Sequence, residues 1–270
     1  MKGKKRINKS QNIHLALFFC GFLLALIIFS LLFKSVQVFQ RSGFDGKHRF
    51  TIAASFSNVN ELISFSPDNG TISILLMPRE DKISEIQKKV QVPVDGNVVL
   101  SSIDNVDSND VPSRISLFVF KKESDNRLTI IDYLRLYLFS KTVPQSQITI
   151  KKMEPEEDFL INDKIVSGLF SDHTISKEQI NIQVINGSGK EGVGNRLARL
   201  IANSGGNVIS VVTGKPSDDS KILFSEESYT LSRLSRILGF KKEKNLEEKD
   251  HQIYDIIITI GKDSLLSEKF

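Results

Sequence analysis

The chain has 270 residues, of which 40% are hydrophobic and 25% charged, a composition that excludes a disordered chain. Its net charge is +4, but residues 1–40 hold six basic residues and no acid, so the rest sums to −2 (30 basic, 32 acidic). This confines the basic character to the N-terminus and excludes a nucleic-acid-binding face on the folded part. With a single cysteine, Cys20, and four scattered histidines, a disulfide framework is excluded and no metal site is readable.

An uncharged run, LALFFCGFLLALIIFSLLF, follows the basic cluster at 15–33. As a helix, its 19 residues match a bilayer core of about 30 Å. The preceding basic residues favour a cytoplasmic N-terminus. The alternative is a cleaved signal peptide, which the length of the run and the lack of a small-x-small cleavage site disfavour. We therefore expect a cytoplasmic tail at 1–12, a single transmembrane helix at 13–33, and the bulk of the chain in the extracytoplasmic space.

A juxtamembrane connector at 34–48 is expected to lead into a middle α+β domain at 49–152. Its first strand is RFTIAAS. The segment LISFSPDNGTISILLMP predicts two strands joined by a Pro-Asp-Asn-Gly turn, the best hairpin signal in the chain.

The segment LTIIDYLRLYLFSK, at 128–141, predicts a helix in this middle domain. Thr129 can cap its start, with Asp132 three residues later in the capping-box position. Periodicity predicts a buried face made of Leu128, Ile131, Leu134, Tyr137 and Leu138.

Residues 153–179 begin with an acidic stretch and show weak periodicity, which predicts an interdomain linker. Three apolar side chains in it are expected to pack against the neighbouring domains: Phe159, Leu169 and Phe170.

The segment 180–266 predicts a small α/β sandwich with the order β-α-β-β-α-β. Its last strand, YDIIITIG, is nearly continuously apolar and is therefore expected to be central in the sheet. Gly239 is expected to end the second helix. The buried helix positions are predicted to be Val193, Leu197, Leu200, Ile201, Leu231, Leu234, Ile237 and Leu238.

A glycine-rich loop joins the first strand and helix of this segment, and Gly187, Gly189 and Gly192 fit the spacing G-x-G-x-x-G. Three interpretations are open: a structural turn with Asn186 and Gly187 in left-handed conformations, an anion or glycan contact, and a nucleotide site. The domain is too small for two mononucleotide-binding halves, and no acid ends the second strand. No cofactor is therefore expected. The candidate ligand-binding residues are Asn186, Gly187, Ser188, Gly189 and Lys190.

These elements resemble the C-terminal domain of LytR–CpsA–Psr proteins over about 180–264. The resemblance is carried by a strand ending in Asn186-Gly187, a helix that starts and ends near glycine, and the closing segment DIIITIGKD with Gly261 and Asp263. It implies an extracytoplasmic protein anchored by one N-terminal transmembrane helix. The role of this C-terminal domain in the family is poorly defined.

The resemblance also raises the question of catalysis, because the family's separate catalytic domain transfers glycopolymers from polyprenyl-pyrophosphate lipids to peptidoglycan. Arginines there hold the pyrophosphate and aspartates hold a divalent metal. Residues 62–81 are similar to the start of that domain: Pro78 and Arg79 match, but Glu80 replaces the expected aspartate. Arg79 is thus the one candidate catalytic residue.

Other parts of the family's catalytic pattern are missing from this sequence. An aspartate is expected before the first of these strands, where Asn58, Asn60 and Glu61 stand instead. The remaining arginines of the segment, at 114, 127 and 135, look isolated. The middle domain is therefore predicted to be a degenerate, non-catalytic relative of the catalytic domain.

We expect a membrane-anchored protein of cell-envelope assembly or maintenance that binds peptidoglycan, a glycopolymer or an envelope protein. One alternative is a diverged glycopolymer phosphotransferase that acts through Arg79. A second is a membrane-tethered regulator, although a cytoplasmic part of about 12 residues is too short for a DNA-binding domain. The lysines of this N-terminal tail are instead expected to contact anionic lipid headgroups.

Overall fold

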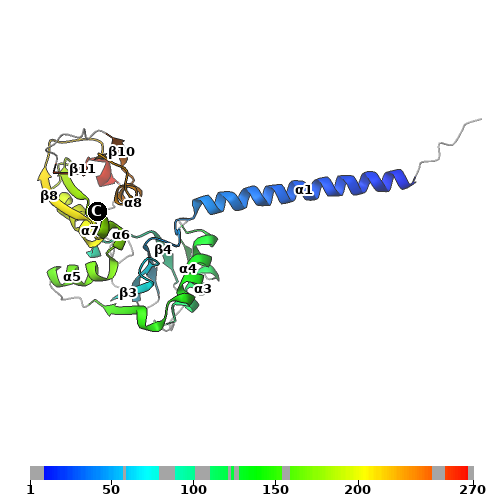
Figure 1. Cartoon of the computed structure of the whole chain (residues 1–270), viewed down its shortest axis with the longest axis horizontal. Helices are drawn as coiled ribbons and strands as arrows, with labels where there is room; N and C mark the ends of the chain where they lie inside the picture. The colour runs from blue at the N-terminus through cyan, green and yellow to red at the C-terminus, as the bar shows by residue number, and fades with distance from the viewer. Residues whose placement is uncertain are drawn as a thin grey trace, which may run out of the picture.

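The computed structural model describes residues 9–56, 59–78, 89–100, 110–120, 123–124, 128–153, 159–244 and 253–266. Within these ranges, one long N-terminal helix leads into two α/β bodies, each built on its own mixed sheet (Figure 1). The predicted mixed α/β class, with an N-terminal apolar helix, is confirmed.

The N-terminal helix, α1, spans Lys9–Arg41. Its stretch Ala16–Arg41 is long and apolar enough to cross a membrane, and no residue of its most apolar 18-residue window is buried against the described part of the protein. The helix continues eight residues beyond the end of the predicted span at 33, because residues 34–41 contain no glycine or proline to stop it. The first half of the expected connector is therefore helical.

The first sheet has the strand order β5-β4-β1-β2-β3-β6. Strands β2 and β3 form the predicted antiparallel hairpin, with Ser66 paired to Thr71 across the turn. Strands β4 and β6 lie parallel to β1 and β3. The strands are β1 Phe50–Ser55, β2 Val59–Ser66, β3 Thr71–Pro78, β4 Gly96–Val99, β5 Glu123–Ser124 and β6 Ile148–Lys152.

Helices cover both faces of this sheet. On one face, α3 (Val111–Phe120) and α4 (Ile130–Thr142) pack over side chains such as Ile63 and Phe65. The other face is covered by α5 (Phe159–Phe170), which lies in the segment expected to be a linker. Its residues Leu169 and Phe170 are buried, as predicted, against Leu62 and Leu75. A sheet buried on both faces leaves no alternating polar pattern in its strands.

Helix α4 has the predicted capping box, but its buried face differs from the prediction. The Asp132 carboxylate accepts from the Thr129 N–H at 2.7 Å, and the Thr129 hydroxyl accepts from the Asp132 N–H at 3.2 Å. The buried residues are Asp132, Tyr133, Leu136 and Ser140, whereas Leu134 and Leu138 are 57% and 55% exposed. Apolar residues occur on the inner and the outer side of the helix, so periodicity alone does not define its buried face, and the hydrogen bonds of buried Asp132 help to fix its rotation.

The second sheet has the order β10-β9-β11-β7-β8, with β11 central as predicted. Helices α7 and α8 cover one face, and their predicted inward residues are buried, with Ile237 partly buried at the margin. Gly239 ends α8 with a φ of 71°. The elements are α6 His173–Glu178, β7 Asn181–Asn186, α7 Val193–Asn203, β8 Asn207–Thr213, β9 Lys221–Phe224, α8 Tyr229–Leu238, β10 Lys241–Lys244, β11 Ile256–Ile260 and α9 Asp263–Leu266.

Strand β10 was not predicted. Its sequence, KKEK, has no apolar alternation, and charged residues are typical of edge strands that avoid pairing with other chains.

Polar contacts join the two bodies. The Arg233 guanidinium of α8 forms a bidentate pair with Asp95 of the middle domain, at 2.5 and 2.8 Å. The Asn203 amide, at the end of α7, donates to the carbonyl of Val90 at 3.2 Å. The ring of His48, just before β1, stacks on Tyr229 with ring centroids 4.1 Å apart. The C-terminal body is therefore docked on the middle body through buried polar groups.

Candidate functional site

The loop at 186–190 uses its own polar side chains to close the turn. The Asn186 amide donates to the carbonyl of Lys190 at 2.8 Å, and its side-chain oxygen accepts from the Ser188 hydroxyl at 2.7 Å. The same hydroxyl accepts from the Lys190 N–H at 3.2 Å. Asn186 and Ser188 are buried, while Lys190 is exposed. This geometry is that of a structural turn with an exposed lysine at its tip.

The left-handed residues of the loop differ from the predicted ones. Gly189 and Gly192 have φ values of 76° and 78°, whereas Asn186 and Gly187 do not adopt positive φ. Gly187 is required for another reason: a Cβ there would lie 2.9 Å from the carbonyl oxygen of Lys215. The neighbouring loop therefore approaches the backbone of Gly187 too closely for any side chain.

Three loops interlock at this end of the second sheet. The Gly187 N–H donates to the carbonyl of Ile260 at 2.9 Å, and the Gly187 carbonyl accepts from the Ser217 N–H at 2.8 Å. The Ser217 carbonyl in turn accepts from the Lys262 N–H at 3.0 Å. We call the hydrogen-bonded segments 186–190, 214–220 and 260–263 the three-loop junction.

The closing Gly-x-Asp pair completes the junction. A Cβ on Gly261 would lie 2.4 Å from the backbone carbon of Asp219, so only glycine fits. The Asp263 carboxylate accepts from the Ser220 N–H at 3.1 Å and from the Ser220 hydroxyl at 2.5 Å. Partial burial acts to raise the pKa of Asp263, but these hydrogen bonds outweigh it and lower that pKa. The residues that carry the resemblance thus hold the loops of the three-loop junction against one another.

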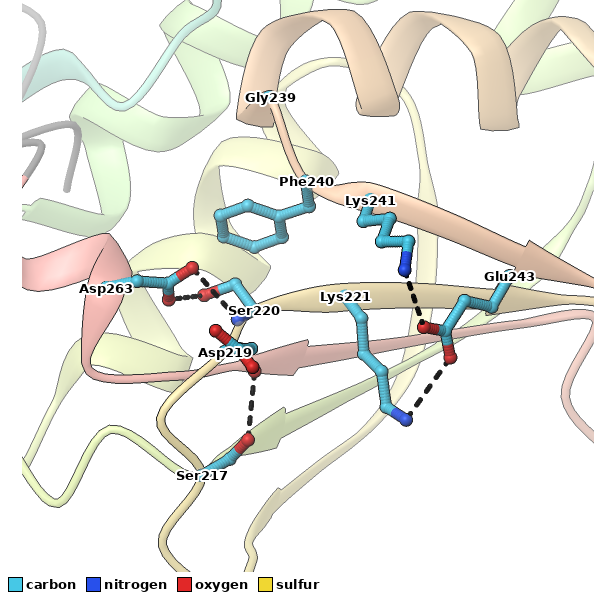
Figure 2. A pocket seen from close by; sticks show the side chains of 9 residues that line it. All are labelled: Ser217, Asp219, Ser220, Lys221, Gly239, Phe240, Lys241, Glu243 and Asp263. Atoms are coloured by element: carbon cyan, nitrogen blue, oxygen red, sulfur yellow. Dashed lines mark hydrogen bonds and ion pairs between the residues drawn. The ribbon is translucent and has the colours of Figure 1, made fainter.

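A hollow with a volume of about 560 Å³ opens beside the three-loop junction (Figure 2). Phe240, at the end of α8, lines one wall. To the right of Phe240 in Figure 2, the Glu243 carboxylate lies 3.4 Å from the Lys221 ammonium and 3.8 Å from the Lys241 ammonium. Other polar lining residues come from the junction itself: Ser217, Asp219, Ser220 and Asp263.

The side chains that line this hollow are suited to reversible binding of a polar ligand. Hydroxyls, carboxylates and two ammonium groups can exchange hydrogen bonds with a polyhydroxylated or weakly charged ligand, and Phe240 adds an apolar wall. The described residues contain no group of three or more His, Cys, Asp or Glu arranged to hold a metal ion. The sequence prediction named the loop beside the hollow but missed Lys221, Lys241 and Glu243. Only the fold of β9 and β10 brings these three together.

The candidate catalytic residue Arg79 lies outside the described residues, as do Asn58, Glu80 and Arg127. Strand β3 ends at Pro78, immediately before Arg79.

Two arginines of the middle domain that looked isolated in the sequence have specific partners. Arg114 of α3 forms an ion pair with Glu61 of β2, and their side chains are only 2% and 1% exposed. Burial raises the pKa of the Glu61 carboxyl, and the Arg114 charge offsets part of that rise. Arg135 of α4 donates to the carbonyl of Phe44 at 2.6 Å. These partners are 53 and 91 residues away in the sequence, so they could not be predicted from the local sequence.

Comparisons with known proteins agree with the fold of the second body. Residues 179–263 match a family model described as LytR cell envelope-related transcriptional attenuator. The last third of the chain is therefore a LytR-type C-terminal domain, as the resemblance predicted. Together with the apolar helix α1, this domain indicates a cell-envelope-associated protein.

Comparisons over the whole chain add little. The X-ray structure of the Lin1025 protein from Listeria innocua is similar over 70% of this chain and 96% of that one, with 12% identity. Its TM-score of 0.18 is too low to carry any argument. No curated protein sequence matches the chain.

Proposed function

We propose that this protein is a single-pass, membrane-anchored module of the cell envelope that binds wall glycan and is not an enzyme. Helix α1 anchors it with its N-terminus in the cytoplasm, and the bulk of the chain lies outside the membrane. The LytR-type domain binds peptidoglycan or an attached glycopolymer in the hollow beside the three-loop junction. The observation that carries the proposal is that a signature residue of this domain, Asp263, lines that hollow, while Gly261 packs against the backbone of another lining residue, Asp219.

The chemistry of the hollow supports a glycan more than a compact anion. Both lysines lie near Glu243, so their charges are partly balanced before any ligand arrives. A pyrophosphate would need several unbalanced cations and a metal. A polymer with many hydroxyls and scattered charges needs several weak hydrogen bonds instead, which a polar, open hollow supplies.

The test is retention of the full-length, detergent-solubilised protein on insoluble peptidoglycan, with and without its attached glycopolymer. The variant Lys221→Ala/Lys241→Ala should bind at least tenfold more weakly, because each hydrogen bond to a charged group contributes about 1.5–3 kcal/mol and about 1.4 kcal/mol corresponds to tenfold. The matched control, Lys190→Ala/Lys215→Ala, removes the same charge from exposed positions outside the hollow.

The possible results distinguish the hollow from the glycine-rich loop as the binding site. Unchanged retention of the Lys221/Lys241 variant would refute the hollow as the binding site. Loss in the Lys190/Lys215 variant alone would transfer the site to the glycine-rich loop.

The rival function, a diverged glycopolymer phosphotransferase, receives less support. The buried Arg114 side chain is paired with Glu61 in the core, so it is not available to a lipid pyrophosphate at the surface. The rival therefore depends on Arg79. Transfer activity or metal-dependent binding of a polyprenyl pyrophosphate that Arg79→Ala abolishes would establish it in place of the binding role.

A further inference from the structure

Helix α4 carries an apolar stripe that none of the described residues covers. Ile130, Leu134 and Leu138 are 67%, 57% and 55% exposed. Their spacing of four residues aligns them along one side of the helix, opposite the buried residues Tyr133 and Leu136. Single exposed apolar residues are ordinary, but a contiguous line of large ones marks an interaction surface.

This stripe lies on the helix that holds the end of α1. The Asp132 carboxylate accepts from the Phe44 N–H at 2.8 Å and from the Ser42 hydroxyl at 2.7 Å. The Arg135 guanidinium lies over the ring of Phe39, 4.7 Å from its centroid. Helices α3 and α4 also lie on the side of the first sheet toward which α1 extends (Figure 1). The outer surface of α4 therefore faces the direction in which the anchor leaves the domain.

The sequence of α1 indicates how far the contact between Phe39 and Arg135 lies from the hydrocarbon core of the membrane. The uncharged run of α1 ends at Phe33, and Lys34 follows it. Phe39 is five residues beyond Lys34, which is about 7.5 Å along a helix. The headgroup region extends about 5–8 Å beyond each side of the hydrocarbon core. With Lys34 at the edge of the core, the contact between Phe39 and Arg135 lies at headgroup level.

The residues that flank the stripe have the chemistry of a membrane surface. Lys141, exposed at the C-terminal end of the stripe, lies over the ring of Tyr137 at 5.5 Å. Arg135 flanks the stripe on the side of α1. Cations and an aromatic ring beside an apolar line are typical of helices at the boundary between acyl chains and headgroups.

We infer that α4 rests on the outer leaflet of the membrane that α1 crosses, with Ile130, Leu134 and Leu138 inserted among the acyl chains. This inference rests on the anchoring role proposed for α1. It fixes the orientation of the middle domain on the membrane, a role separate from glycan binding by the C-terminal domain.

The experiment uses the natural absence of tryptophan from the chain. The full-length variants Leu134→Trp and Leu138→Trp are reconstituted into phosphatidylglycerol vesicles with or without brominated acyl chains, which quench tryptophan on contact. We expect a blue-shifted emission and a roughly twofold loss of intensity in brominated vesicles. Ile209→Trp, at a 42% exposed position on β8, is the matched negative control, and Phe19→Trp in α1 reports insertion of the anchor.

The outcomes separate the inference from the anchoring on which it rests. Quenching at position 19 but at neither 134 nor 138 would overturn the membrane contact and leave the anchor intact. No quenching at position 19 would overturn the anchoring and the inference with it. Blue-shifted but unquenched emission at positions 134 and 138 would mean that protein, such as a second copy, covers the stripe, which also overturns the inference.

Discussion

Replacing Asp95 with asparagine should loosen the docking of the LytR-type domain on the middle domain. Asp95 is the charged partner of Arg233, whose side chain is only 3% exposed. Burial acts to lower the pKa of Arg233, but the Asp95 charge more than offsets it and raises that pKa. Asparagine keeps an oxygen that can accept from the Thr51 N–H, now bonded to Asp95 at 2.9 Å. The substitution therefore removes mainly the charge.

The expected cost follows from the burial of the pair. Removing one partner of a buried, bidentate ion pair leaves an uncompensated charge and costs about 3–5 kcal/mol. With a urea dependence of about 2–3 kcal/mol per molar, the unfolding midpoint should fall by roughly 1–2 M. In the double variant Asp95→Asn/Arg233→Met the unpaired charge is gone, so at least half of the lost stability should return.

The assay is urea unfolding of the full-length chain in detergent micelles, followed by far-ultraviolet circular dichroism. Hydrogen exchange at the Thr51 amide gives a local readout of the same interface. If Asp95→Asn lowers the free energy of unfolding by less than about 1 kcal/mol, the pair behaves like a solvent-exposed ion pair, and the prediction based on its burial is refuted. The prediction is also refuted if the double variant Asp95→Asn/Arg233→Met is no more stable than Asp95→Asn.

Three further predictions concern local features. Thr129→Ala removes the cap of α4 and should lower the free energy of unfolding by about 1 kcal/mol in the same urea assay. Gly261→Ala forces a Cβ against the backbone of the neighbouring loop and should cost about 1–3 kcal/mol, whereas Gly168→Ala, at an open position in α5, should be neutral or stabilising; equal effects would refute the steric account. Partial burial acts to raise the pKa of Asp45, but hydrogen bonds from the side chain and backbone of His48 outweigh it and lower the pKa to about 2. This pKa is below the value of about 3.9 in the unfolded chain. The ionised Asp45 carboxylate therefore stabilises the folded state above that pH, and this stabilisation is lost as the pH falls through about 2. His48→Gln should raise the pKa of Asp45, measured from its carboxyl carbon resonance by NMR, and an unchanged value would exclude the His48 side chain as the cause.

The C-terminal domain was largely predictable from its sequence because its elements are short-range and amphipathic. Helices α7 and α8 each bury one stripe, and the inward positions Leu197 and Leu234 follow the helical period. Strand β11 is apolar because it is central. Strand β10 was missed because an exposed edge strand needs no apolar residues, so KKEK looks the same as a loop.

The middle domain was less predictable because its sheet is buried on both faces. Helix α4 has apolar residues on its inner and outer sides, and the hydrogen bonds of a buried acid, Asp132, help to fix which side faces the core. The covering role of α5 follows from the second face of the sheet, to which β3 contributes Leu75. Neither effect is visible in the periodicity of a single segment.

The candidate site was predictable only in part, for a related reason. Asn186 and Gly187 were predicted as ligand contacts or as left-handed turn residues. They are not left-handed, and the hydrogen bonds of Gly187 go to two loops that come later in the chain. The hollow beside them is lined by residues of β9 and β10 whose individual identities are ordinary surface lysines and a glutamate. Such a site appears only when the strands are paired.

The place where the anchor joins the fold has a mechanical consequence. The chain leaves α1 and enters β1, which pairs with β2 on one side and β4 on the other. A pull on α1 therefore reaches a central strand, and both hydrogen-bond ladders must yield before that strand comes free. A tether on an edge strand would instead open one ladder bond by bond. If the hollow holds wall glycan, tension between α1 and the wall also crosses the docking contacts of the LytR-type domain, where Tyr229 stacks on His48 and Arg233 pairs with Asp95.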